Sequence, residues 1–258
     1  MSEFLNIKTF LILCPMLFLT GFVDSVAGGG GLISLPSYLF VGIPVHLAAG
    51  TNKVVNSIGT ATATLRYIRS GKVDLRSAAW AALGALVGAA AGARLALWCS
   101  EQVLQACVLV ALPIAAVILV VKKDFGKETS STRQWTPRQK ILLSVLIGFI
   151  IGMYDGMIGP GTGTFMIMAF TMVLGMDLLT ASGCSKTANL ASNVASAAVW
   201  IAGGKVIWPL VLPAAVFCVL GNLCGARYAI RGGSEKVRGM IFVVLGLLFV
   251  KMISELFF

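Results

Sequence analysis

Two parts of the chain repeat the same pattern of glycine, charged and amide residues. An aspartate followed by a glycine-rich stretch occurs at residues 24–31 and again at residues 155–162, which is 131 positions later. Three further pairs of matching segments share an offset of 133 positions, namely 50–56 with 183–189, 71–73 with 204–206, and 88–94 with 221–227. The chain is therefore a duplication whose halves differ by one two-residue insertion or deletion.

Composition places this duplication in a membrane. Hydrophobic residues make up 58% of the chain and charged residues only 12%, whereas soluble proteins contain about 25% charged residues. The mean hydropathy is +0.93. Several apolar runs approach the roughly 20 residues that a helix needs to cross a bilayer, and we do not see the alternating segments of a strand barrel. We expect an all-α integral membrane protein surrounded by lipid. Matched, glycine-interrupted segments in such a protein are typical of transporters whose site lies between two repeats.

The remaining bulk features argue against several classes of protein. The net charge of +10 lies mainly in connecting segments, so it reflects the excess of basic residues on the cytoplasmic side of membranes rather than nucleic-acid binding. The six cysteines form no CxxC pair, so neither a disulfide framework nor a metal site is indicated. The sequence contains no GxxxxGK[ST] motif, so we expect no ATP-binding loop and no cofactor. The apolar run at residues 10–22 is expected to be a retained segment rather than a signal peptide.

Each half of the chain contains five apolar segments. They lie at 9–27, 31–42, 46–68, 75–98 and 102–121 in the first half, and at 139–158, 162–175, 178–202, 206–229 and 236–257 in the second. One clearly polar and basic connection separates the halves. The sequence therefore predicts a first transmembrane repeat at 1–121, a basic cytoplasmic linker at 122–138 and a second transmembrane repeat at 139–258.

The second segment of each half is short, at about a dozen residues or ~18 Å of helix. Segments one and two either form a re-entrant hairpin with its glycine-rich tip near the midplane, or cross the membrane as short or tilted spans. Both alternatives return the chain to its starting side. All three strongly basic connections, near residues 66–76, 122–140 and 227–238, then lie on one face, which is cytoplasmic by the positive-inside rule. The odd number of segments makes the halves inverted repeats, with both termini outside.

The glycine-rich tips are candidate anion-binding sites, at Gly29, Gly30, Gly161 and Thr162. Backbone at membrane depth must be buried in protein or line a water-filled cavity, and a helix N-terminus directs free N–H groups toward an anion. The alternative is that these glycines only permit close helix contact or act as a hinge.

Two lysines, Lys53 and Lys186, lie at matched positions inside apolar segments. A lysine costs roughly 3 kcal/mol at the centre of a membrane helix, and ionisable residues at that depth usually mark a transport pathway. The alternatives are snorkelling to the membrane surface or an ion pair with Asp24 or Asp155. Neighbouring polar residues extend the cluster and can bind the same anion or join helices by hydrogen bonds; they are Asn52, Asn56, Ser185 and Asn189.

Asp24 and Asp155 directly precede the two glycine-rich breaks. They can neutralise the lysines, cap the following helix or carry protons for coupled transport. A structural role as a cap or as an ion-pair partner is favoured over a proton relay.

One family pattern matches these residues. Gly-x-x-Asp-x-x-x-Gly-Gly-Gly-Gly-x-x-x-x-Pro at residues 21–36 is followed by Ala-Ala-Gly-Thr-Asn-Lys at 48–53 and Gly-Lys-Val at 71–73. The chain resembles the sulfite exporter TauE/SafE family, also called the TSUP permeases, and residues 148–189 carry the family's second-repeat pattern. The resemblance implies a bacterial inner-membrane carrier of sulfite, sulfoacetate or other organosulfonates. Pro160 stands where the first repeat has Gly29, and Pro36 has no counterpart, so the two tips are not equivalent.

Together, these patterns predict a secondary transporter for a small sulfur-containing anion. The inside-negative membrane potential favours export when no other ion is coupled. The alternatives are an anion channel with the same tips and a proton-coupled importer of organosulfonates. An enzyme is not expected, because the sequence shows no convincing nucleophile–base set. The expected partners are the small anion and the lipid bilayer, and a homodimer is left open.

Overall fold

A computed structural model of the chain describes residues 6–104, 106–107, 135–157 and 159–257. The helices in these ranges account for nearly all of the described chain, and no strand is found among them. They are α1 (Ile7–Ala27), α2 (Gly31–Phe40), α3 (Val45–Arg69), α4 (Leu75–Trp98), α6 (Pro137–Met157), α7 (Thr162–Leu174), α8 (Leu178–Ala202) and α9 (Trp208–Phe257). The prediction of an all-helical protein is confirmed for these residues.

The predicted segments agree with the helices to within two residues up to the end of α8. The two segments predicted at 206–229 and 236–257 correspond to the two parts of α9, which meet at a kink where Gly233 is non-helical (φ 67°, ψ −165°). The predicted segment at 102–121 and the linker at 122–138 fall largely outside the described residues.

Aspartate side chains cap the start of two of the long helices. Asp74 caps α4 by accepting hydrogen bonds from the backbone N–H groups of Arg76 and Ser77. Asp177 caps α8 in the same way, with Leu179 and Thr180 as donors. Burial raises the pKa of the Asp177 carboxyl, but hydrogen bonds from Thr180, Leu179 and Ser234 outweigh this effect and lower the pKa below its usual value. A charged aspartate at a helix N-terminus also interacts favourably with the helix dipole.

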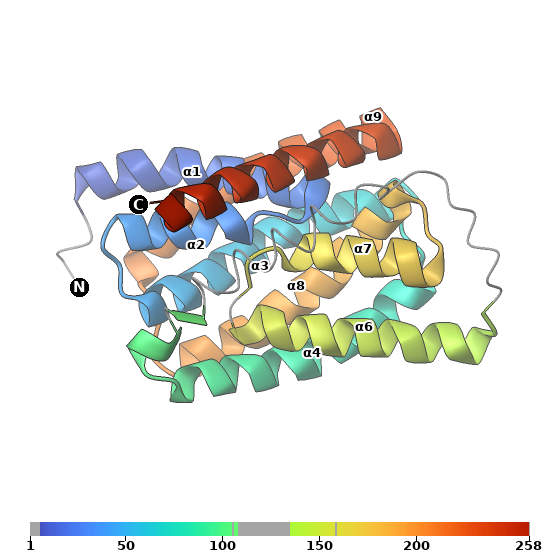
Figure 1. Cartoon of the computed structure of the whole chain (residues 1–258), viewed down its shortest axis with the longest axis horizontal. Coiled ribbons are helices and arrows are strands. Elements are labelled where there is room, and N and C mark those ends of the chain that lie inside the picture. Colours follow the sequence, from blue (N-terminus) through green and yellow to red (C-terminus); the bar gives the residue numbers. More distant parts are fainter. Residues whose placement is uncertain (1–5, 105, 108–134, 158, 258) are drawn as a thin grey trace.

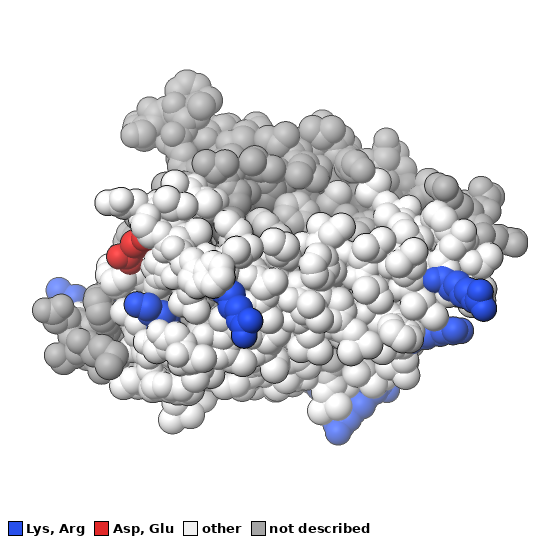
Figure 2. Space-filling model, turned by 90° about the horizontal axis from the view of Figure 1, so that it is seen from below, with Lys and Arg blue, Asp and Glu red and all other residues white. Residues whose placement is uncertain are grey.

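Four of the described helices are long and apolar enough to cross a membrane: α1, α4, α6 and the Trp208–Val243 part of α9. α3 and α8 have 25 residues each, or about 37 Å of helix, but they carry more polar residues. Most of the described surface in the view of Figure 2 is uncharged, as expected for a surface in contact with lipid. These features support a multi-pass membrane protein.

The halves of the chain exchange their outer helices (Figure 1). α1 of the first half packs along α9 of the second, and α6 of the second half packs along α4 of the first. α3 and α8 contact each other between these two pairs. Each half therefore completes the packing of the other.

The contacts between the halves are reciprocal. A Cβ atom added to Gly88 of α4 would lie 2.2 Å from the carbonyl oxygen of Phe149 in α6. A Cβ atom added to the matched Gly221 of α9 would lie 2.0 Å from the carbonyl oxygen of Phe18 in α1, which is the residue matched with Phe149. Small residues of this kind let helix backbones approach closely in membranes, and reciprocal contacts are the pattern that a two-fold axis produces.

The direction of the chain agrees with such an axis, because α1 and α6 run in opposite directions along the long axis of Figure 1. The inverted orientation of the halves in a bilayer stays a prediction, and so does the choice between re-entrant and spanning hairpins.

Candidate functional site

The two glycine-rich breaks meet in the interior of the protein. Gly28 ends α1 in the left-handed conformation with a φ of 75°, and its backbone N–H donates to the carbonyl of Asp24. A Cβ atom added to Gly28 would lie 2.2 Å from the carbonyl carbon of Gly163, in the first turn of α7. Only glycine combines this backbone conformation with so close an approach. The tips of the two hairpins are therefore in direct contact.

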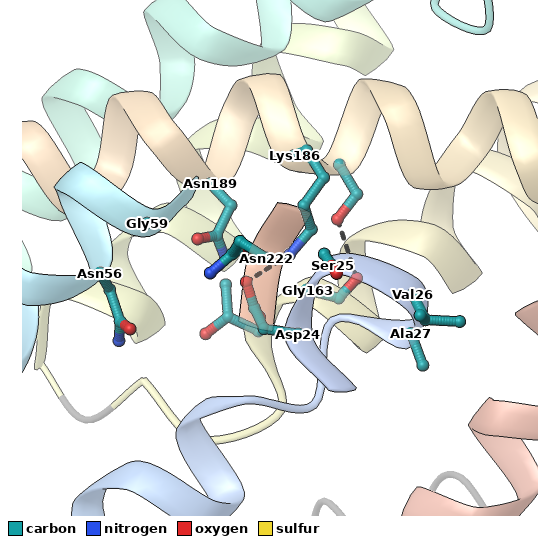
Figure 3. A network of polar contacts seen from close by, with 12 residues as sticks. Asp24, Ser25, Val26, Ala27, Asn56, Gly59, Gly163, Lys186, Asn189 and Asn222 are labelled. Atoms are coloured by element: carbon teal, nitrogen blue, oxygen red, sulfur yellow. Dashed lines mark hydrogen bonds and ion pairs between the residues drawn. The ribbon is translucent and has the colours of Figure 1, made fainter. Parts of the chain in front are cut away.

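Both buried lysines form ion pairs, and each pair joins the two halves. Lys53 Nζ lies 2.7 Å from Asp155 Oδ2, and Lys186 Nζ lies 2.6 Å from Asp24 Oδ2 (Figure 3). The two pairs are equivalent under the duplication, since Lys53 matches Lys186 and Asp24 matches Asp155. Of the alternatives left open by the sequence, the ion pair is what the structure shows, and neither lysine snorkels.

Because both lysines are buried, each of them depends on its aspartate partner. The residue Lys186 is 0% exposed and Lys53 is 5% exposed. Breaking a buried ion pair by removing one partner typically costs 3–5 kcal/mol, because an uncompensated charge remains in the interior. Each aspartate therefore compensates a lysine that has no other ion-pair partner among the described residues.

The two aspartates differ in their remaining partners. Asp155 also accepts a hydrogen bond from the hydroxyl of Ser192 in α8. The position matched with Ser192 is Gly59 in α3, which offers Asp24 no such donor. The side chain of Asp24 is 14% exposed, against 4% for Asp155. Asp155 is therefore the more tightly held carboxylate.

Amide side chains lie on the same faces of the helices as the lysines. The Nδ2 atom of Asn56 donates to Oδ1 of Asn52 at 3.1 Å, and Asn193 donates in the same way to Asn189 one turn earlier on α8. Each amide keeps further donors or acceptors for a ligand. Asn193 was not predicted; its spacing of four residues from Asn189 was a signal, but the matched residue, Thr60, is not an amide.

A small cavity lies where the tips, the lysines and the amides converge. It leaves about 20 Å³ for the centre of a water molecule, which is room for about one water and too little for a sulfonate group. Its lining residues are Asp24, Gly28, Gly31, Leu35, Asn52, Lys53, Asn56, Asp155, Gly159, Pro160, Thr162, Gly163, Asn189 and Asn193. Binding of an anion must therefore widen the cavity.

The structure brings most of the predicted site residues to this cavity. Those that line it are Asn52, Lys53, Asn56, Thr162 and Asn189, with both aspartates. Lys186 lies behind Asp24 and does not reach the cavity surface.

Four predicted residues take structural positions instead. The hydroxyl of Ser185 donates to the carbonyl of Gly163 at 2.9 Å, which fixes the start of α7. Gly30 packs against Asp24, since an added Cβ atom would lie 2.5 Å from the Cβ of that residue. Gly29 and Gly161 are likewise absent from the cavity surface, where their neighbours Gly28, Gly31, Gly159 and Gly163 lie instead. A helix turn alternates which residues face inward, so the motif alone did not distinguish these glycines.

Comparison with known proteins places this chain among membrane transporters. The family model described as "Sulfite exporter TauE/SafE" matches residues 13–252. The chain is 34% identical to a probable membrane transporter protein, ORF9, of Sinorhizobium sp, over 92% of this chain and 90% of the relative. It is 30% identical to the probable membrane transporter protein YfcA of Escherichia coli K12, over 92% and 87% of the two chains. A probable membrane transporter protein of Haemophilus influenzae is 29% identical over 97% of both chains. No solved structure matches the chain.

Proposed function

The chain belongs to the sulfite exporter TauE/SafE family, and we propose that it is a secondary transporter for a small sulfur-containing anion such as sulfite, sulfoacetate or another organosulfonate. The observation that carries the proposal is the cavity between two opposed hairpin tips, with Lys53 on its surface and Lys186 directly behind Asp24. Sites between duplicated, broken helices are characteristic of secondary transporters.

The chemistry of the cavity suits an oxyanion. Lys53 supplies positive charge, and Asn52, Asn56, Asn189 and Asn193 supply amide donors around it. Sulfite and sulfonate groups present several oxygens that accept such hydrogen bonds. The sulfur in the proposed substrate rests on the family, since amides and lysines recognise other oxyanions as well.

A carrier fits the geometry better than a channel does. The cavity admits about one water molecule, and the two ion pairs lie beside it. A carrier exposes such a small central site alternately to the two sides of the membrane, whereas a channel needs a continuous open path.

Counterflow in liposomes tests the proposal. Purified protein is reconstituted into vesicles that contain an unlabelled anion, and the uptake of the labelled anion is followed with the membrane voltage clamped. Sulfite, thiosulfate, methanesulfonate and sulfoacetate form the screen, with protein-free vesicles as the control. We expect transient accumulation of the label for at least one of them. Absence of counterflow for all four contradicts the proposal, and a voltage-driven current without counterflow supports the channel.

The direction of transport depends on coupling. An uncoupled carrier exports an anion, because a potential of 100 mV, inside negative, is worth about 2.3 kcal/mol per charge. The pairing of both lysines with carboxylates favours a second candidate, a proton-linked carrier whose direction follows the pH gradient.

A further inference from the structure

The candidate site has no net charge before an anion arrives. Lys53 and Lys186 are balanced by Asp155 and Asp24. Both carboxylates also line the cavity, so they repel any anion that enters it. Placing an uncompensated charge in a site of low dielectric constant costs several kcal/mol. A proton on one of the two carboxylates removes the repulsion and releases a lysine for the anion.

Asp24 is the better placed of the two to take this proton. Its side chain is more exposed than that of Asp155, at 14% against 4%. Asp155 additionally accepts a hydrogen bond from Ser192, so one of its oxygens is already occupied by a second donor beside Lys53. Asp24 has Gly59 at the corresponding position.

Unpaired polar atoms lie on the helices around Asp24. Thr20 Oγ1 in α1, Ser34 Oγ and Tyr38 Oη in α2, and Asn222 Oδ1 in α9 have no hydrogen-bond partner among the described residues. Thr20, Ser34 and Tyr38 are 0% exposed, and Asn222 is 1% exposed. Each unpaired buried group costs about 1–3 kcal/mol, and buried polar groups without a protein partner usually bind an internal water molecule.

These four groups belong to one region that begins at Asp24. A Cβ atom added to Gly30 would lie 2.5 Å from the Cβ of Asp24 and 2.9 Å from the carbonyl oxygen of Thr20. Ser34 and Tyr38 follow Gly30 at intervals of four residues, so they lie on the same face of α2. The positions on α1 and α2 recede from the hairpin tip toward the start of α1.

α9 closes the same region on its other side. Asn222 Nδ2 lies 3.4 Å from the sulfur of Cys218 in the same helix, and Cys218 is 0% exposed. A Cβ atom added to Gly21, next to Thr20, would lie 2.8 Å from Asn222 Nδ2. Figure 3 shows Asn222 beside the Asp24–Lys186 pair.

With the offset of 131 residues continued from the glycine-rich break along α1 and α2, and the offset of 133 residues for α9, the other half of the protein has apolar residues at the matched positions. They are Ile151 for Thr20, Phe165 for Ser34, Ala169 for Tyr38 and Ala89 for Asn222. A general requirement of the fold would place polar residues in both halves. The polar region therefore has a role that is specific to the half of the protein that contains the Asp24–Lys186 pair.

We propose that these four side chains hold a chain of water molecules through which Asp24 exchanges protons with the side of the membrane at which α1 begins, so that the anion is carried together with a proton. This inference rests on the proposed anion transport. The titratable groups that face Asp24 are Lys186 from α8, Tyr67 from α3 and Cys218 from α9. Lys53 and Asp155 lie across the same cavity. α7 carries no titratable residue, and α2 carries Tyr38.

The charges balance at each step. A water molecule of the chain transfers a proton to Oδ2 of Asp24, which becomes a neutral carboxyl group. The ammonium group of Lys186 keeps its charge, which then balances the charge of the anion in the cavity. Two lysines, Asp155 and a monoanion then sum to zero, as before binding. Release reverses the sequence, and the proton leaves with the anion.

The first experiment measures methanesulfonate uptake into liposomes, because this strong acid stays a monoanion and cannot carry the proton itself. A pH gradient, acidic outside and at clamped zero voltage, should drive uphill uptake. Tyr38→Phe and Thr20→Val should each reduce this net uptake about tenfold. Each variant removes one hydrogen bond to the water chain, and a loss of ~1.4 kcal/mol corresponds to a tenfold change. Counterflow should persist in both variants, because exchange of the loaded carrier requires no proton release.

Thr171→Val provides the matched control, since Thr171 Oγ1 is also buried and unpaired but lies near the end of α7. Its pH-driven uptake should stay normal. Counterflow without any uphill uptake overturns the proton inference and leaves the anion carrier intact. Loss of counterflow in the unmodified protein contradicts the anion carrier for this probe and overturns both.

A second experiment detects the water without any substrate. Brief X-ray irradiation splits water, and the resulting hydroxyl radicals label the side chains next to it. Tyr38 and Cys218 should be labelled although both are 0% exposed. Met166 and Phe170, equally buried on α7, should remain unlabelled. Equal labelling of the two sets, or protection of both, rules out a water chain confined to the Asp24 half.

Discussion

The two ion pairs consist of the same residue types, a lysine and an aspartate, but have different surroundings. Lys53–Asp155 is reinforced by Ser192 and is almost closed to solvent. Lys186–Asp24 has no such reinforcement and adjoins the unpaired hydroxyls of Thr20, Ser34 and Tyr38. Duplication thus supplied two equivalent charge pairs, and substitutions at neighbouring positions made them unequal. We infer that one pair holds the halves together, while the other opens to admit the anion.

The largest expected effect concerns the orientation of the two halves in the membrane. Lys72 follows α3 and the matched Lys205 follows α8. In a background without native cysteines, Lys72→Cys and Lys205→Cys should react with a membrane-impermeant thiol reagent from opposite sides of the membrane. Lys236→Cys serves as the control and should react from the same side as Lys72→Cys, since both lie in basic connections. Labelling of the two matched positions from one side contradicts the inverted repeat.

The next largest effect tests how the lysines are paired. Lys186→Met leaves Asp24 without an ion-pair partner and should lower the free energy of unfolding by about 3–5 kcal/mol. Lys53→Met should cost less, because Ser192 still donates to Asp155. Thermal unfolding in detergent measures both.

Double variants separate stability from function at the same positions. Lys186→Met with Asp24→Asn removes both charges of one pair and should recover most of the lost stability, whereas Lys186→Met with Asp155→Asn should not. Both double variants should remain unable to transport, since a lysine of the site is missing. Recovery of transport in the first double variant would mean that Lys186 only compensates Asp24.

A smaller difference is expected between the two left-handed glycines at the tips. Gly28→Ala introduces a Cβ atom 2.2 Å from the backbone of Gly163, whereas the nearest atom to a Cβ at the matched Gly159 is 3.3 Å away. Both changes cost about 1–2 kcal/mol of backbone strain, but only Gly28→Ala adds about 1–3 kcal/mol of overpacking. The melting temperature of Gly28→Ala should be the lower. Equal melting temperatures would show that the tips do not touch as described.

The smallest effect tests the reinforcement of Asp155. Ser192→Ala removes the hydrogen bond to this carboxylate, which is worth about 1.5–3 kcal/mol, and makes the two ion pairs more alike. Stability should fall modestly and anion counterflow should continue. Counterflow in Ser192→Ala at wild-type stability would indicate that this hydrogen bond does not distinguish the pairs.

Local sequence patterns were sufficient to predict the helices and the polar cluster. Apolar runs and the glycine-rich breaks that interrupt them act within a few residues, so the helix bounds follow from the sequence. The matched positions of Lys53 and Lys186 also identified residues that the structure brings to the centre.

Partners that come from different helices were not predictable in the same way. The sequence left open whether Lys53 pairs with Asp24 or Asp155, because both lie at helix ends of unknown relative position. The hydrogen bond from Ser192 to Asp155 and the inward position of Gly31 in place of Gly30 depend on how α6, α7 and α8 pack. The unpaired hydroxyls are visible only once burial is known.

The exchange of outer helices has a consequence for how the protein is made. α4 packs its glycines Gly84, Gly88 and Gly92 against α6, and α1 packs against the glycines Gly221 and Gly225 of α9. Both α4 and α1 are synthesised before those partners exist. In the bilayer, lipid must therefore cover these faces of the first half until the second half has been synthesised. Expressed as separate polypeptides, the halves should be degraded when alone and should survive when produced together.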